Sequence, residues 1–258
     1  MKMNKMSNEN NENNGPPVAV RNLRKAFGEQ RVLDGINLNV ASGETVAVLG
    51  RSGTGKSVLL KLIIRLQAPD SGSIAVAGRD MGNIDMNGLN EVRKKIGFLF
   101  QQAALYDSMS VADNVAFPLT RHAALSGADR RKRVQELLAS VGMEEDMKKL
   151  PSQISGGMQK RVGLARALAL DPEILLFDEP TAGLDPITAE EISGLIVDLK
   201  KKRRMSAIVV THDVPRAKIF ADRLVLLHEG KIRVEGTFAE LQESRDEIVQ
   251  HFLGETGR

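Results

Sequence analysis

A glycine-rich segment, residues 50–57, has the spacing of a phosphate-binding loop. It matches the pattern G-x-x-x-x-G-K-[ST] and lies between an apolar run that predicts a strand and a segment with helical spacing. Glycines let backbone N–H groups approach phosphate oxygens that a Cβ atom would block. A lysine ammonium can neutralise β- and γ-phosphates, and a serine hydroxyl can bind Mg²⁺. The residues that we expect to hold ATP and Mg²⁺ here, with Ser57 as a magnesium ligand, are Gly50, Arg51, Ser52, Gly53, Thr54, Gly55, Lys56 and Ser57.

Two carboxylates directly follow the apolar run Ile174–Phe177. A buried strand that ends in acidic residues places them at the carboxyl edge of a parallel sheet, beside the phosphate loop. We expect Asp178 to hold Mg²⁺, directly or through water, and Glu179 to accept a proton from the attacking water. A positioned general base contributes roughly 10²–10⁴ in rate. The alternative is a strand end with two solvated acids.

A second anion site is indicated at Ser155, Gly156 and Gly157, which open an Ala- and Leu-rich helical segment. A helix N-terminus attracts anions, and one nucleotide does not need two such sites. The surplus suggests that this loop closes over the nucleotide of a second copy of the chain. The alternative is a helix cap and nothing more.

Two polar side chains follow other predicted strands. His212 comes after the run Ala207–Val210, and Gln101 comes after Gly97–Phe100. We predict catalytic roles for both. A lone histidine is structural as often as it is catalytic. The side-chain amide of Gln101 can also bind Mg²⁺ or hold water without titrating.

The segments that must position these residues alternate between strand and helix, which predicts a mainly parallel sheet in an α/β fold. A helical stretch at about 102–170 would be inserted between two parts of that sheet. Thr237 with Glu240 forms a capping box and predicts a C-terminal helix over 237–258. The Asn- and Glu-rich residues 1–17 predict a disordered tail. The further strands are expected near Val18–Arg21, Gly35–Val40, Thr45–Leu49, Ile74–Val76, Leu224–Leu227 and Ile232–Glu235.

The amino-acid composition excludes several classes of protein. The 258 residues contain no cysteine, so there is no disulfide framework and no thiolate metal site. No apolar run approaches the roughly 18 residues that a membrane span needs. The net charge of +3 does not argue for nucleic acid, and the basic runs 130–133 and 200–204 are interpreted as exposed helix faces. We therefore expect a soluble protein whose membrane role, if any, comes through a partner.

These motifs occur in an order that resembles the ATP-binding cassette (ABC) ATPases over about residues 18–235. Residues 50–57 resemble the Walker A loop, Gln101 the Q-loop glutamine and Ser155–Gln159 the signature motif. The remaining matches are Ile174–Glu179 to Walker B, Ala182-Gly183-Leu184-Asp185 to the D-loop, His212 to the switch histidine and Phe27 to the aromatic that stacks on adenine. The resemblance implies a P-loop NTPase (RecA-like) core, with a small antiparallel β subdomain and an inserted α-helical subdomain, over residues 18–236.

The resemblance also implies how the residues act. Two copies would sandwich two ATP molecules, with Ser155 and Gly157 touching a γ-phosphate across the interface. His212 would contact the γ-phosphate in its own subunit, and Asp185 would link the two sites. Hydrolysis would separate the pair, and the Q-loop region would pass that motion to an integral-membrane permease.

One departure concerns the fifth residue of the signature, where Met158 replaces the usual glutamine. Together with Leu99-Phe100-Gln101 and the run Asp113–Leu119, it resembles the ATPases of MCE-type (Mla-like) phospholipid transporters. That resemblance implies an MCE-domain partner, a possible small regulatory subunit, and a place on the cytoplasmic face of the bacterial inner membrane.

Two alternatives stay open. An amino-acid importer has a similar ATPase, whereas a sugar-type importer needs a large regulatory domain for which the residues after Gly236 leave no room. An ABC ATPase that acts on DNA or ribosomes would carry paired cassettes or long coiled-coil inserts, and this sequence has neither.

Overall fold

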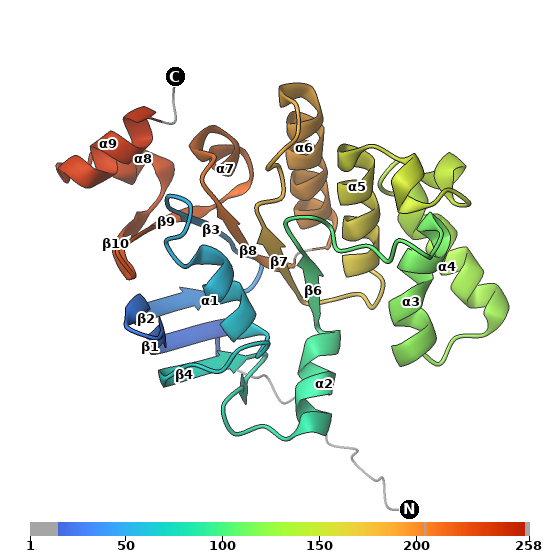
Figure 1. Ribbon diagram of the computed structural model, residues 1–258, viewed down its shortest axis with the longest axis horizontal. Coiled ribbons are helices and arrows are strands. Elements are labelled where there is room, and N and C mark those ends of the chain that lie inside the picture. Colours follow the sequence, from blue (N-terminus) through green and yellow to red (C-terminus); the bar gives the residue numbers. More distant parts are fainter. Residues whose placement is uncertain (1–14, 204, 256–258) are drawn as a thin grey trace, which may run out of the picture.

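The computed structural model describes residues 15–203 and 205–255, which form an α/β fold with two sheets (Figure 1). The larger sheet has the strand order β10-β9-β3-β8-β7-β6 and is parallel except for β10. The smaller sheet has the order β2-β1-β4-β5 and is antiparallel throughout. The expected P-loop core and small antiparallel subdomain are therefore confirmed. The strands are β1 (Val18–Phe27), β2 (Gln30–Val40), β3 (Thr45–Leu49), β4 (Ser71–Val76), β5 (Arg79–Asp80), β6 (Ile96–Leu99), β7 (Ile174–Asp178), β8 (Ser206–Thr211), β9 (Arg223–His228) and β10 (Lys231–Gly236).

The central strands are covered on both faces, because every residue of β3, β7 and β8 is buried. Successive side chains of a strand point to opposite faces. Val46 and Val48 accordingly pack in one core cluster, and Ala47 and Leu49 pack in the other. This double burial explains the continuous apolar runs in the sequence.

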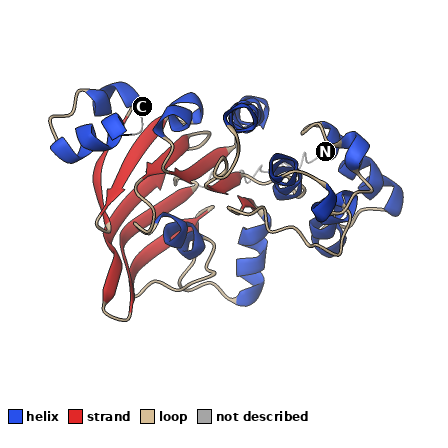
Figure 2. Ribbon diagram, turned by 45° about the horizontal axis from the view of Figure 1, so that its top comes forward, coloured by secondary structure: helices blue, strands red, loops and turns tan. Residues whose placement is uncertain are grey.

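The helices between β6 and β7 lie to one side of the sheets (Figures 1 and 2). Serine caps begin them: the hydroxyls of Ser110 and Ser126 accept hydrogen bonds from the backbone N–H groups of Asp113 and Asp129. α5 packs against both β6 and α3, so it joins this group to the sheet. The helices of the fold are α1 (Lys56–Ile63), α2 (Met86–Lys94), α3 (Val111–His122), α4 (Gly127–Ala139), α5 (Gly156–Ala167), α6 (Pro186–Arg203), α7 (Val214–Phe220), α8 (Phe238–Gln242) and α9 (Glu247–Glu255), with short 3₁₀ turns at Glu144–Asp146 and Pro151–Gln153.

The C-terminal segment differs from the sequence prediction. The capping box of Thr237 and Glu240 is present, but it opens the short helix α8, and the single helix predicted over 237–258 is wrong. A second helix begins because the Asp246 carboxylate accepts hydrogen bonds from the N–H groups of Ile248 and Val249. Leu241, Val249 and Phe252 are buried in the core of their own domain, in the same cluster as Leu224 and Leu226 of β9.

The predicted N-terminal tail falls mostly on residues 1–14, which lie outside the described residues. Described residues 15–17 lead directly into β1, and the Pro17 carbonyl accepts a hydrogen bond from the N–H of Ala77. Within the described part of the chain, no helix has the length and apolar character that a membrane crossing requires.

Asn114 holds the loop that leads from β6 into α3. It is fully buried, and its Oδ1 accepts from the N–H of Tyr106 at 2.8 Å. Its Nδ2 donates to the carbonyls of Tyr106, Met109 and Ser110, each at 3.1 Å. We expect Asn114→Leu to lower the free energy of unfolding by about 1–3 kcal/mol, because buried backbone groups lose their partner.

Urea denaturation measures this effect. Thr120→Val is the matched control, since the Thr120 hydroxyl is exposed and bonds only within its own helix, to the Ala116 carbonyl. The control should change stability by less than about 0.5 kcal/mol. An equally small change for Asn114→Leu would contradict the structural role of this side chain.

Candidate active site

The strand order brings the predicted site residues to one edge of the larger sheet. In the parallel register Leu49 lies beside Thr211, Val210 beside Asp178, and Phe177 beside Leu99. From these neighbouring strand ends, β3 continues into the phosphate loop and β7 into Glu179. In the same way β8 leads to His212 and β6 leads to Gln101. This edge is where parallel α/β sheets bind ligands.

The phosphate loop connects β3 to α1 and needs its glycines. Gly55 has a φ of +100°, which is the left-handed region that side chains disfavour. A Cβ atom at Gly55 would also lie only 2.8 Å from Cγ1 of Val32. The backbone is therefore free to present N–H groups at the start of α1, as phosphate binding requires.

Lys56 is 5% exposed and folds back over the phosphate loop. Its Nζ donates hydrogen bonds to the carbonyls of Gly50 at 2.7 Å and Arg51 at 3.0 Å, and it lies 3.4 Å from Oε1 of Glu179. Burial lowers the pKa of Lys56, whereas the carboxylates of Glu179 and Asp178 raise it. The ammonium thus sits inside the loop, where it can meet phosphate oxygens.

Two of the three predicted oxygen ligands for Mg²⁺, Ser57 and Asp178, are in direct contact. The Ser57 hydroxyl donates to Oδ1 of Asp178 at 2.7 Å. Among the described residues, no group of three or more His, Cys, Asp or Glu side chains could hold a metal ion. A hydroxyl with one carboxylate fits Mg²⁺, which commonly takes one or two protein ligands and completes its shell with water and substrate phosphates.

The Glu179 carboxylate lies between the side chains of His212 and Lys56. Its Oε2 is 3.0 Å from Nδ1 of His212, and its Oε1 faces the Lys56 ammonium. The residue is 8% exposed and has a φ of +46°, and its N–H donates to the Val210 carbonyl. An unusual backbone conformation at a buried acid is typical of an active site.

Phe27, Gln101 and Gly156 take no part in the hydrogen bonds and ion pairs that join Lys56, Ser57, Asp178, Glu179 and His212, and they lie on neighbouring surfaces. Phe27 is 46% exposed at the end of β1, with the Lys25 ammonium 5.3 Å from its ring centre. Gln101 and Gly156 line one cavity of about 490 Å³, together with the D-loop residues Ala182–Leu184. The structure thus brings the Q-loop glutamine, the signature and the D-loop to a common surface.

The signature serine and the D-loop aspartate both begin helices. The Ser155 hydroxyl accepts from the N–H of Met158 at 3.3 Å, so the interpretation as a helix cap is correct for this chain alone. Asp185 accepts from the N–H groups of Ile187 and Thr188 at the start of α6, and hydrogen bonds from Thr188 lower its pKa. Gly157 packs so tightly that an added Cβ atom would lie 2.3 Å from Cγ2 of Thr188.

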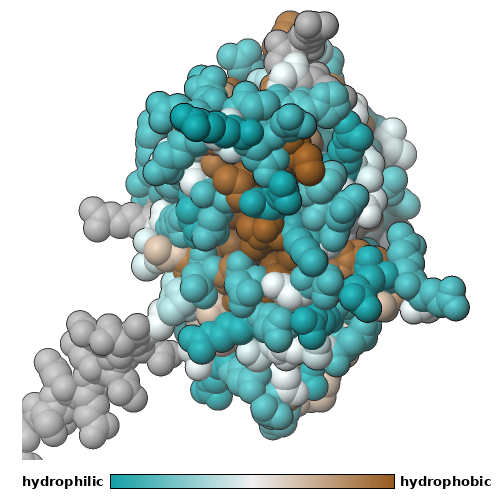
Figure 3. Space-filling model, turned by 90° about the vertical axis from the view of Figure 1, so that its left-hand side faces the viewer, coloured by the Kyte–Doolittle hydropathy of each residue, from teal (hydrophilic) through white to brown (hydrophobic). Residues whose placement is uncertain are grey.

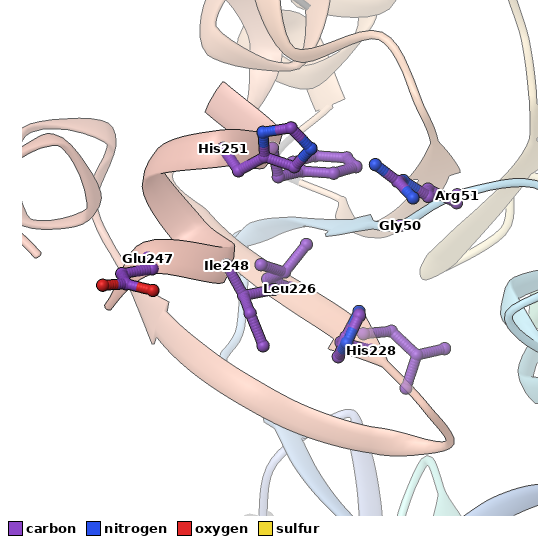
Figure 4. A pocket seen from close by; sticks show the side chains of 9 residues that line it. Gly50, Arg51, Leu226, His228, Glu247, Ile248 and His251 are labelled. Atoms are coloured by element: carbon purple, nitrogen blue, oxygen red, sulfur yellow. The ribbon is translucent and has the colours of Figure 1, made fainter. Parts of the chain in front are cut away.

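A second cavity, of about 430 Å³, lies beside the start of the phosphate loop (Figure 4). Gly50 and Arg51 line it together with Leu226 and His228 of β9 and with residues of α9. On the side of the molecule that carries β10 and α9, hydrophobic atoms are visible in a hollow among hydrophilic residues (Figure 3). The C-terminal helix α9 is therefore a neighbour of the nucleotide site, which the sequence did not predict.

The sequence also gave no indication of Lys160. This side chain is 4% exposed and donates hydrogen bonds to the carbonyls of Gln101 and Glu179. A lysine in a helical segment resembles a surface residue, and only the packing of α5 against the two loops places it in the site.

The fold and the site define a P-loop protein that uses nucleoside triphosphate. The sequence model of the family described as ABC transporter matches residues 33–182, and the chain belongs to this family. It binds ATP with Mg²⁺ and hydrolyses the ATP.

Several relatives have names that refer to transport. The probable ribonucleotide transport ATP-binding protein mkl of Mycobacterium tuberculosis is 41% identical over 239 residues, which are 93% of this chain and 67% of that protein. The methionine import ATP-binding protein MetN of Brucella abortus is 41% identical over 221 residues, which are 86% of this chain and 60% of that protein. The chain thus spans only part of the length of either relative.

Solved structures show the same fold. The ATP-binding cassette MJ0796, in a dimeric post-hydrolysis state bound to ADP and Pi, is 37% identical, with a TM-score of 0.78 over 85% of this chain and 98% of that chain. CbiO1 from Clostridium perfringens, part of the ABC transporter complex cbiONQ, is 31% identical, with a TM-score of 0.81 over 93% and 95%.

Proposed function

We propose that this chain is the energy-coupling ATPase of an MCE-type (Mla-like) phospholipid transporter in a bacterial envelope. It would work at the cytoplasmic face of the inner membrane, bound to an integral-membrane permease. An MCE-domain protein and a small regulatory subunit would complete the transporter. The motif that carries this proposal is the signature with Met158 in its fifth place, supported by the run Asp113–Leu119.

One observation supports the proposed catalytic roles: the Glu179 carboxylate lies between Lys56 and His212, and Lys56 and Ser57 follow each other in the phosphate loop, where Ser57 contacts Asp178. Glu179 acts as the general base that takes a proton from the attacking water. Lys56 neutralises charge on the β- and γ-phosphates, and His212 contacts the γ-phosphate from the side of β8. Ser57, Asp178 and Gln101 would hold Mg²⁺, which would neutralise charge that develops during phosphoryl transfer.

The signature acts on the nucleotide of a second copy of the chain. The cavities that contain Gly50 and Gly156 have no lining residue in common. Ser155 and Gly156 are exposed at the N-terminus of α5, where a helix attracts anions. A two-fold pair would place this loop against the partner's phosphate loop, with Gly157 beside it and Asp185 near the interface. The dimeric state of MJ0796 supports the pairing.

The second candidate is the ATPase of a small-solute importer. It is favoured by the 41% identity to MetN, whose name refers to methionine import. Both candidates share the ATP chemistry and differ in the transported molecule and in the partner proteins.

Purification from native membranes distinguishes the two candidates. The tagged full-length chain should carry with it a permease and an MCE-domain protein, and phospholipid should be enriched in the complex. Recovery of a permease with a periplasmic amino-acid-binding protein would instead assign the chain to the importer. Recovery of ribosomes or DNA would contradict both candidates.

A further inference from the structure

Lys160 of α5 connects two parts of the active site that are far apart in the sequence. Its ammonium donates one hydrogen bond to the carbonyl of Gln101 and another, at 3.1 Å, to the carbonyl of Glu179. A lysine that is 4% exposed is unusual, because burying an ammonium is costly unless it is paired. Two backbone carbonyls accept hydrogen bonds from the Lys160 ammonium, and the carboxylates of Asp178 and Glu179 lie near it.

The positive charge of Lys160 lies near the negative charges of two carboxylates. Burial lowers the pKa of the side chain to about 8, while the neighbouring carboxylates of Asp178 and Glu179 raise it. The group therefore carries its positive charge at neutral pH. Its position offsets part of the negative charge that the two acids bring to the end of β7.

The hydrogen bond from Lys160 to the Glu179 carbonyl helps to fix the backbone of Glu179, and with it the direction of the Glu179 carboxylate. The left-handed backbone of Glu179, with a φ of +46°, costs roughly 1–2 kcal/mol for a residue with a Cβ atom. Hydrogen bonds hold it there: its N–H donates to the Val210 carbonyl, and its own carbonyl accepts from Lys160 and from the N–H of Ala182. Such conformations persist where the surroundings fix them. Lys160 is the only side chain among these partners.

A second side chain of α5 also bonds to the segment that follows Gln101. Arg166, further along the same helix, donates to the carbonyls of Ala103 at 2.6 Å and Ala104 at 2.8 Å. These two alanines also have left-handed backbones. Arg166 thus holds the shape of the loop, whereas Lys160 joins the loop to Glu179.

We propose that Lys160 is a positioning residue that couples the signature helix α5 to Glu179 and to the Q-loop of its own chain. The proposal rests on the role of Glu179 as general base. Ser155, Gly156 and Gly157 lie little more than one turn before Lys160 on the same helix. Contact of the signature with the partner's nucleotide would therefore adjust the base in its own site, so that each site senses the occupancy of the other.

The test compares Lys160→Met, which keeps the length of the side chain but cannot donate, with Lys160→Arg, which can. In the full-length chain we expect Lys160→Met to lower kcat for ATP hydrolysis about 10- to 100-fold, in line with the cost of misplacing a catalytic group. The KM for ATP should stay within about threefold, because phosphate contacts are unchanged. Lys160→Arg should recover at least half of the lost activity on a logarithmic scale.

Arg161→Met is the matched control. Arg161 is the next residue of α5, and its replacement by Met removes the same charge. Its side chain donates hydrogen bonds to the Val141 carbonyl and to Glu191, which lie outside the site. It should keep kcat within about threefold of wild type. A kcat for Lys160→Met in that same range would overturn the proposal, as would an equal loss in both variants.

A double variant separates positioning from a general structural effect. If Lys160 acts through Glu179, adding Lys160→Met to Glu179→Gln should lower the residual single-turnover rate by less than about threefold. A further loss as large as in the wild-type background would refute action through Glu179. The Glu179→Gln variant alone tests the base, so failure of that assignment is distinguishable from failure of the role of Lys160.

Discussion

Replacing Glu179 with glutamine is expected to reduce ATP turnover by roughly 10²–10⁴, the range that a positioned general base contributes. The amide keeps the shape of the side chain and can still contact His212 and Lys56, but it cannot take a proton from water. ATP binding should persist, because the phosphate loop is unchanged. Steady-state phosphate release and fluorescent-nucleotide binding measure the two quantities.

Glu173→Gln is the control for the loss of a glutamate. Glu173 precedes the same strand, β7, at its opposite end, where it is exposed and paired with Lys95. Its replacement should leave turnover within about twofold of wild type. If Glu179→Gln also keeps turnover within a few-fold of wild type, Glu179 is not the base.

Replacing Lys56 with alanine is expected to weaken ATP binding at least tenfold. The ammonium lies inside the phosphate loop and would form hydrogen bonds to charged oxygens, each worth about 1.5–3 kcal/mol, or roughly 10- to 100-fold in affinity. The substitution also removes the cation next to Glu179. Equilibrium titration with a fluorescent ATP analogue measures the change.

Lys94→Ala serves as the matched control for Lys56→Ala. Lys94 is a surface residue of α2 that pairs with Glu91 and lies outside the site. Its removal should leave ATP affinity unchanged. Equal affinity for ATP in Lys56→Ala and wild type would disprove the role of the phosphate loop lysine.

The chemistry of the site could be predicted because its residues follow strands of one kind. The runs before Gly50 and Asp178 are apolar without interruption, which identifies buried parallel strands, and parallel strands end at the same edge. Local sequence therefore determined both the elements and their relative placement. The contacts of Ser57 with Asp178 and of Glu179 with His212 follow from that arrangement.

The polar parts of the fold were predicted less well. β1 and β2 extend to Phe27 and from Gln30, well beyond the predicted apolar runs Val18–Arg21 and Gly35–Val40. Their polar ends pair across the strands, for example by the ion pair of Arg24 with Asp34. Such pairs depend on strand register, which alternation of apolar residues indicates only where one face is buried.

Lys160 and the break between α8 and α9 were missed for different reasons. The environment of Lys160 is created by loops that lie 59 and 19 residues away in the sequence. The break near residue 244 depends on hydrogen bonds from Gln250 back to the carbonyls of Gln242 and Ser244. Lys160 has no local signature, because tertiary contacts create its environment. The break is set by hydrogen bonds within residues 242–250, among them the Asp246 cap, which the apolar spacing of the predicted helix did not reveal.

The association state of the Glu179→Gln variant tests the central claim, that two copies of the chain together form the ATP site. Sedimentation velocity would be measured with Mg²⁺ and either ATP or ADP. The account predicts a dimer with ATP, because the intact nucleotide would hold the phosphate loop of one chain to the signature of the other, and a monomer with ADP. A monomer that binds ATP without dimerising at any protein concentration tested would contradict the composite site.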